Sequence, residues 1–212
     1  MEKINKNDRR ALITAIVGSG LDDLNVMFLA FSMSSIVAQL GISQTQGGWI
    51  ATFTNFGMLA GGLIFGVLAD RYNKYRVFKW TIAIFSIATA LIFFTPNISY
   101  LYLMRFLAGV GVGGEYGVAI AIMAGIVPPE RMGRISAFNG IAGQVGSIAS
   151  AILAAFVAPV FGWRGLFLMG LLPLVLVAYM HFAIDADKVS NHRVAKDVTV
   201  KPSIAELFAS PT

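Results

Sequence analysis

The sequence predicts an all-α, polytopic membrane protein with six transmembrane helices. Hydrophobic residues make up 57% of its 212 residues and charged residues only 13%, whereas a soluble domain typically carries about 25% charged residues. The mean hydropathy is +0.73. Six apolar runs are each long enough to cross a bilayer, because a spanning helix needs roughly 20 residues at about 1.5 Å of rise each.

The first three expected spans follow polar or charged segments. The span 11–38 follows MEKINKNDRR, which resembles the charged start of a signal peptide. However, the apolar stretch behind it is too long and contains Asp22 and Asp23, so we expect an uncleaved helix. The span 47–69 follows QLGISQTQGG, and the span 77–95 follows GVLADRYNKYR.

The last three expected spans run over 99–127, after TPNIS, over 134–160, after PPERMGR, and over 164–184. The basic residues set the orientation, because Lys and Arg are retained on the cytoplasmic side. Apart from Arg105 and Arg164, every Lys and Arg lies on the side that carries both termini. We therefore expect a multi-pass plasma-membrane protein with cytoplasmic termini.

Composition and motifs exclude several classes of function. The chain has no cysteine, and His181 and His192 lack the spacing of metal ligands, so we expect no metal or other cofactor. The net charge of +5 forms no basic face and is explained by cytoplasmic loops, so we expect no nucleic-acid partner. An enzyme would need a nucleophile with a base, or a metal motif, inside the spans, and neither is present. A pore or a receptor would need a ring motif or an ectodomain, which the sequence lacks.

The connection 66–76 carries an acid that topology does not explain. Its bases are expected in a cytoplasmic loop, but Asp70 is not. The order GVLADRYNKYR resembles the loop signature of the major facilitator superfamily, with Asn73 where that family usually has glycine. Asparagine tolerates the left-handed backbone conformation better than most residues, so we expect the turn to form.

Further segments resemble the same superfamily in the expected order. They are QGGW at the start of the second span, Arg105-x-x-x-Gly-x-Gly-x-Gly-Gly-Glu115 in the fourth, and Gly162-Trp-Arg before the sixth. The connection 128–134 is a looser match, with Met132 where an arginine is common. The resemblance covers essentially the whole chain and is nearest to proton symporters of organic acids and sugar acids.

The resemblance implies twelve helices in two halves, each half built of two inverted three-helix repeats, with the substrate near the middle of the membrane. We expect residues 1–184 to form the N-terminal half and residues 185–212 to begin the cytoplasmic linker. The expected partners are a small-molecule substrate, protons, the lipid bilayer and a C-terminal six-helix half, or a second copy of the chain in its place. We expect the sequence to be a fragment, a truncated gene product or one half of a split transporter. A functional dimer of two such halves, or a fragment without activity, is the alternative.

Two charges inside the spans form the candidate coupling site, because a charge in the membrane is costly and usually faces the protein interior. Asp22 lies about 18 Å beyond Arg10, and Arg105 lies about 12 Å from the outer edge at Asn97. In a core about 30 Å thick these depths coincide, so we expect the two to pair. Water or substrate could then switch the protonation of the carboxylate. A static ion pair is the alternative.

Spacing along the first span favours Asp22 over Asp23, because neighbouring residues point about 100° apart on a helix. Asp22 and Asn25 share one stripe with Thr14, Gly18, Leu29 and Ser32, and we expect this stripe to face the cavity. In the organic-acid symporters that the chain resembles, this helix often reads Asp-x-x-Asp. Here Asn25 replaces the second acid, which argues against a scheme with two carboxylates.

The fourth and fifth spans add polar candidates. Arg105 and Glu115 share an arc that we assign to the cavity, with Glu115 as a second protonatable or gating acid. A buried acid that is hydrogen-bonded to helix ends is the alternative. Asn139 and Gln144 are expected to hydrogen-bond either the substrate or a neighbouring helix. Small-residue seams for close packing are expected at Gly57, Gly61, Gly62 and Gly66, and at Gly109, Gly113 and Gly117.

The resemblance also gives the connection 66–76 a role. In the superfamily this loop forms a cytoplasmic latch whose aspartate caps a helix of the opposite half, an arrangement typically worth about 0.3–1 kcal/mol when exposed. The expected latch residues are Gly66, Asp70, Arg71, Lys74 and Arg76. The sequence thus predicts proton-coupled symport of a small carboxylate or sugar acid by alternating access. A uniporter or antiporter of the same fold, for a neutral solute such as a sugar, is the alternative.

Overall fold

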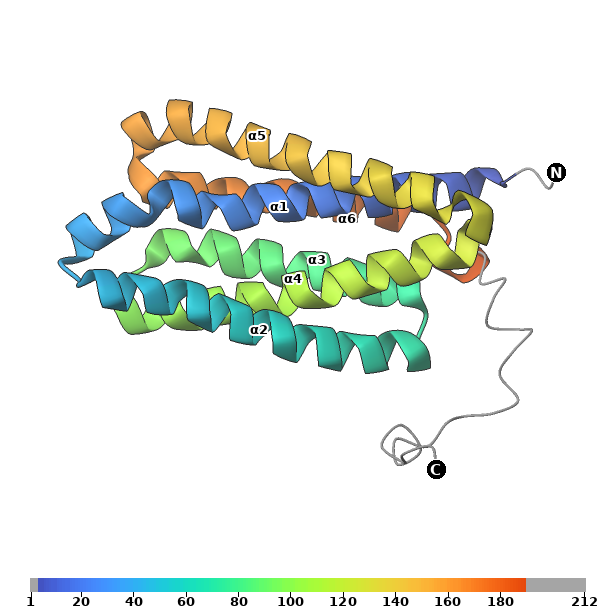
Figure 1. The fold of residues 1–212 in the computed structure, drawn as a ribbon, viewed down its shortest axis with the longest axis horizontal. Helices are drawn as coiled ribbons and strands as arrows, with labels where there is room; N and C mark the ends of the chain where they lie inside the picture. The colour runs from blue at the N-terminus through green and yellow to red at the C-terminus, as the bar shows by residue number, and fades with distance from the viewer. Residues whose placement is uncertain (1–3, 190–212) are drawn as a thin grey trace.

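The chain folds into a bundle of long helices, and the computed structural model describes residues 4–189 (Figure 1). Five helical stretches in this range are long and apolar enough to cross a membrane, the last of them being Pro129–Ala183. The helices are α1 (Lys6–Leu40), α2 (Gln44–Arg71), α3 (Lys74–Leu91), α4 (Ile98–Ile126), α5 (Pro129–Leu168) and α6 (Leu172–Ala183), with short 3-10 helices η1 (Ile92–Phe94), η2 (Met169–Leu171) and η3 (Ala186–Lys188).

The stretch Pro129–Ala183 contains two of the six predicted spans. Its helical path breaks at Gly162, whose φ of 67° lies in the left-handed region that glycine adopts without strain. The chain reverses direction at this end of the bundle (Figure 1). The prediction of an all-helical, six-span unit is therefore confirmed, although α1 and α5 extend beyond the predicted limits.

Polar residues in the connections fix where the helices begin. Asn5 caps α1 by accepting a hydrogen bond from the Asp8 backbone, and Asn97 caps α4. Ser43 and Gln46 form a reciprocal capping box at the start of α2. Each cap satisfies backbone N–H groups that have no partner inside their own helix.

Glycines let two helix pairs approach backbone to backbone. On α2 and α4, a Cβ at any of four glycines would overlap a carbonyl oxygen of the other helix, at Gly57, Gly61, Gly109 and Gly113. The predicted seam therefore exists, but Gly66 and Gly117 face open space and lie outside it. On α1 and α5, the backbones meet at Gly20 and Gly146. These contacts set the positions of the helices relative to one another along the bundle axis, and therefore the positions of their polar side chains.

Candidate functional site

The candidate charged residues lie inside the bundle. Glu115 is 0% exposed, Arg105 is 2% exposed and Asp22 is 8% exposed. Asn25 and Asn139 are also buried, whereas Gln144 is exposed on α5. On α4, Arg105 and Glu115 are both buried, but they contact different neighbouring helices, α2 and α1.

The expected pair between Asp22 and Arg105 does not form. Glu115 lies against Gly18, which fixes how the antiparallel helices α1 and α4 are aligned. From that level Asp22 is four residues along α1, about 6 Å, and Arg105 is ten residues along α4, about 15 Å. The two side chains are therefore offset by about 9 Å along the bundle. The prediction was wrong because it counted depth from Arg10 and Asn97, and α1 extends past the membrane core.

Arg105 instead contacts α2. Its Nε donates a hydrogen bond of 3.2 Å to Oγ1 of Thr54, a residue that the sequence gave no reason to choose. Within the described residues Arg105 forms no ion pair with a carboxylate. A buried guanidinium with this single side-chain partner retains donors that match the two oxygens of a carboxylate.

Glu115 occupies a notch that Gly18 leaves on α1. A Cβ at position 18 would lie 2.8 Å from Oε1 of Glu115 and 2.9 Å from the ring of Phe78. Neither carboxylate oxygen of Glu115 has a hydrogen-bond partner in the described chain, and neither does Oδ1 of Asp22. The expected alternative, a buried acid bonded to helix ends, is therefore not what the structure shows.

The other polar side chains on α1 face different neighbours. Asn25 donates to the Leu21 carbonyl at 2.8 Å, and its Oδ1 lies 3.1 Å from the position that a Cβ on Gly170 would take. Asp23 lies outside the stripe that was predicted to face the cavity, and it is half-buried. Its carboxylate fills the space beside Gly143 on α5. The glycine spacing on the fifth span was the signal that could have identified this contact.

The expected latch residues divide between two environments. Gly66 has open space around its α-carbon, and Asp70 and Arg71 are exposed at the end of α2. Asp70 forms no hydrogen bond or ion pair with any described residue, as expected for a group whose partner lies elsewhere. Lys74 begins α3. Arg76, in contrast, pairs with Asp187 at 2.7 Å, within the same bundle.

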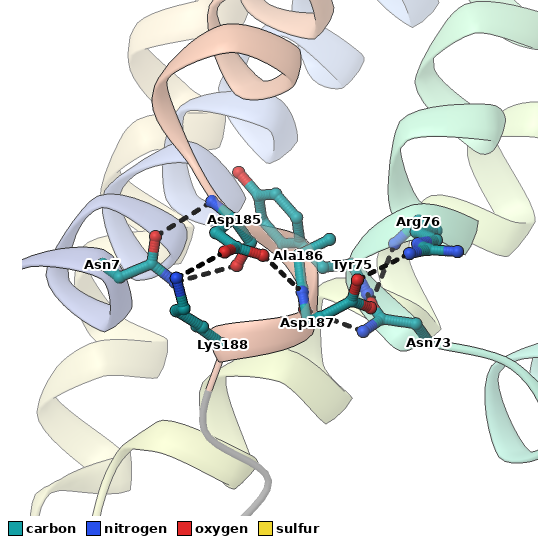
Figure 2. A network of polar contacts seen from close by, with 8 residues as sticks. All are labelled: Asn7, Asn73, Tyr75, Arg76, Asp185, Ala186, Asp187 and Lys188. Atoms are coloured by element: carbon teal, nitrogen blue, oxygen red, sulfur yellow. Dashed lines mark hydrogen bonds and ion pairs between the residues drawn. The ribbon is translucent and has the colours of Figure 1, made fainter.

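Asn73 and Arg76 belong to a network that holds residues 183–188 against the bundle, which we call the clasp (Figure 2). Asn73 caps α3 through its Oδ1 and donates its Nδ2 to the Ala186 carbonyl at 2.7 Å. Asn7 exchanges two hydrogen bonds with the Asp185 backbone, and Arg10 donates to the Ala183 carbonyl. The asparagine that replaces the usual glycine therefore has a structural task that glycine could not perform.

The clasp is also locally charged. A hydrogen bond from Lys188, at 2.9 Å, lowers the pKa of Asp185, and the same contact raises the pKa of Lys188. The segment that was assigned to the linker thus begins with residues fixed to the bundle, while residues 190–212, the rest of the predicted linker, lie outside the described residues.

Comparisons with known proteins agree with this geometry. Residues 15–211 match the profile of the Major Facilitator Superfamily. A putative metabolite transport protein of Haemophilus influenzae is 35% identical over 84% of this chain and 44% of its own length. The niacin transporter NiaP of Acinetobacter baylyi is 35% identical over 76% of this chain and 37% of its own length. The sialic acid transporter NanX of Escherichia coli is 33% identical over 84% of this chain and 44% of its own length.

The fold is shared with solved transporters. The xylose transporter XylE from E. coli, in a partially occluded inward-open conformation, superposes with a TM-score of 0.75 at 17% identity. The match covers 85% of this chain and 51% of that structure. The chain thus spans about half of the solved structure, and less than half of the three sequence relatives.

Proposed function

Because the chain belongs to the major facilitator superfamily, a family of transporters, we propose that it is the N-terminal half of a proton-coupled symporter for a small organic anion. Its partner in this proposal is a second six-helix unit, either a C-terminal half or another copy of the chain. Alternating access would proceed at the interface of the two units, with Asp70 and Arg71 as the part of the latch that faces the partner.

The observation that carries the proposal is a pair of buried acids, Asp22 and Glu115, that have no hydrogen-bond or ion-pair partner among residues 4–189. A carboxylate inside a membrane protein is costly to keep charged when no cation or hydrogen-bond donor faces it. Such a group binds a proton while it is dry and releases it when water or a cation reaches it. This is the property that proton coupling requires.

The anionic substrate is inferred from Arg105. A buried guanidinium that pairs with no acid among the described residues favours a ligand that carries a carboxylate. Niacin and sialic acid, named for two of the relatives, are both small carboxylic acids, which supports this class of substrate. Asn25 and Asn139, each with a buried amide oxygen that has no partner in the part of the chain that the structure describes, are candidates for further polar contacts.

The first experiment determines what the purified chain assembles with, from its mass in mild detergent, and then measures uptake in proteoliposomes that contain this assembly. Labelled nicotinate is the probe, and its neutral analogue nicotinamide is the control. An inward proton gradient is expected to drive nicotinate accumulation, whereas equal uptake with and without the gradient would indicate a uniporter. Other carboxylates, including sialic acid and benzoate, are tested in the same way.

Replacing the proposed proton site gives the sharper test. Asp22→Asn is expected to abolish proton-driven accumulation but to retain exchange of labelled for unlabelled substrate, because exchange needs no net proton movement. Full accumulation by this variant would contradict the role of Asp22. Loss of exchange as well would point to a role in folding or in substrate binding.

A further inference from the structure

We propose that Asp23 is a third coupling carboxylate and the one through which protons reach Asp22 and Glu115. The proposal rests on the proton coupling proposed above and adds a residue to it. The three acids come from α1 and α4, where Glu115 lies against Gly18 and Asp22 follows Gly18 by one helical turn, directly before Asp23. They differ in how far each is open to the surroundings of the bundle.

The position of Asp23 is fixed by the contact between α1 and α5. The backbones meet one turn away, where a Cβ on Gly20 would lie 2.9 Å from the Ala142 carbonyl oxygen. At the same level Gly143 leaves a space that Oδ2 of Asp23 fills, so that no side chain could be added there without displacing the carboxylate. Asp23 is therefore held between two helices.

Exposure decreases along the three acids. Asp23 is half-buried, Asp22 is 8% exposed and Glu115 is fully enclosed beneath it. On α5 the neighbours Gly140 and Gln144 are exposed, so the helix beside Asp23 also borders the outside of the bundle. Asp23 is thus the member of this group that the bundle encloses least, and in this proposal it is the one that exchanges protons with water.

The charges around Asp23 are all acidic. Asp22 precedes it on α1, Glu115 of α4 lies against Gly18 less than two turns away, and residues 139–147 of α5 carry no charged side chain. Arg105 lies about 15 Å from Glu115 along α4 and does not compensate these charges. Like charges at close range cannot all be ionised at low cost, so the group shares at least one proton.

The proposed step is a simple proton transfer. Asp23 accepts a proton from a hydronium ion and leaves a neutral water molecule. The new O–H bond on Asp23 then breaks as an O–H bond forms on Asp22 or Glu115, directly or through one water molecule, and Asp23 becomes a carboxylate again. The movement is reversed on the other side of the transport cycle. No further reactant is needed, and within the described residues these acids do not form a cluster that could hold a metal ion.

The test compares variants of Asp23 with matched glycine variants on α5. Asp23→Asn is expected to slow proton-driven uptake by roughly a hundredfold, the loss typical of a missing proton-transfer group, while substrate exchange is retained. Asp23→Glu should recover part of the rate and shift the pH profile of uptake. Gly143→Ala, which displaces the carboxylate, should resemble Asp23→Asn, and Gly140→Ala, which meets open space, should behave like the parent.

The outcomes separate this inference from the proposed function. If uptake by the parent protein is independent of the proton gradient, both fail. If Asp22→Asn uncouples transport but Asp23→Asn keeps the parent's rate and pH profile, only the role of Asp23 is overturned. Should Asp23→Asn fail to fold, the infrared band of protonated carboxyl groups is compared between the parent and Gly143→Ala. An unchanged pH titration of that band would overturn the inference.

Discussion

Gly61 and Gly62 on α2 are adjacent glycines for which the same substitution should have opposite effects. A Cβ at Gly61 would lie 2.7 Å from the carbonyl carbon and 2.8 Å from the Cα of Val110, both in the α4 backbone. At Gly62 the nearest atom is the Gly113 carbonyl oxygen at 3.6 Å, an ordinary contact. Carbon atoms normally approach to about 3.5–4.0 Å, so Gly61→Ala would push the helices apart by roughly 1 Å.

The two magnitudes follow from packing and helix propensity. Overpacking against backbone, which cannot rotate away, typically costs about 1–3 kcal/mol. Alanine is favoured over glycine in a helix by about 1 kcal/mol, a gain that both variants share. Gly61→Ala is therefore expected to lower stability by up to about 2 kcal/mol, and Gly62→Ala to leave it unchanged or raise it slightly.

Thermal loss of helical circular dichroism in detergent, followed by size-exclusion chromatography of the heated samples, measures this difference. The reasoning requires a lower midpoint for Gly61→Ala than for Gly62→Ala. Equal midpoints, or a lower one for Gly62→Ala, would show that the α2 and α4 backbones are not in close contact and would remove the basis for the alignment of the polar residues on α4.

Two further predictions concern Arg105 and Asn73. Arg105→Lys keeps the positive charge but loses the planar guanidinium group, so the KM for nicotinate uptake should rise about tenfold or more, while the KM for nicotinamide changes little. An equal effect on both compounds would argue against carboxylate binding. Asn73→Gly should increase hydrogen exchange in residues 184–189, because it removes the bond of about 1 kcal/mol to the Ala186 carbonyl, whereas Asn73→Asp keeps the helix cap and loses only the donor. Unchanged exchange in the glycine variant would show that the clasp does not depend on Asn73.

The sequence was sufficient to predict the six spans, because hydropathy depends only on which residues are present and in what order. It did not predict the partners of the buried charges. Those depend on how far one helix slides along another, and here the slide is set by contacts such as Glu115 against Gly18. A shift of about 9 Å, less than two turns, separates an ion pair without changing any hydropathy value, and this is why Asp22 and Arg105 were expected to meet.

Asp23 and Arg76 illustrate a second limit. Helical spacing excluded Asp23 from the stripe of Asp22 correctly, but it could not show that a glycine on α5 would receive the carboxylate. The loop pattern predicted Arg76 to be a latch residue, but its partner Asp187 lies in a segment that the family resemblance assigned to a linker. Both contacts join residues far apart in the sequence, where local patterns carry little information.

The clasp also constrains the order of events during synthesis. Asn7 meets Asp185, a residue 178 positions later, and Arg10 meets Ala183 across 173 positions. At a translation rate of about 5–20 residues per second, the start of α1 waits roughly 9–36 s for these partners. The polar ends of the first helix must be satisfied by water or lipid headgroups until then. Completion of residues 183–188 is thus the step at which the start of α1 is fastened to the segment that follows α6.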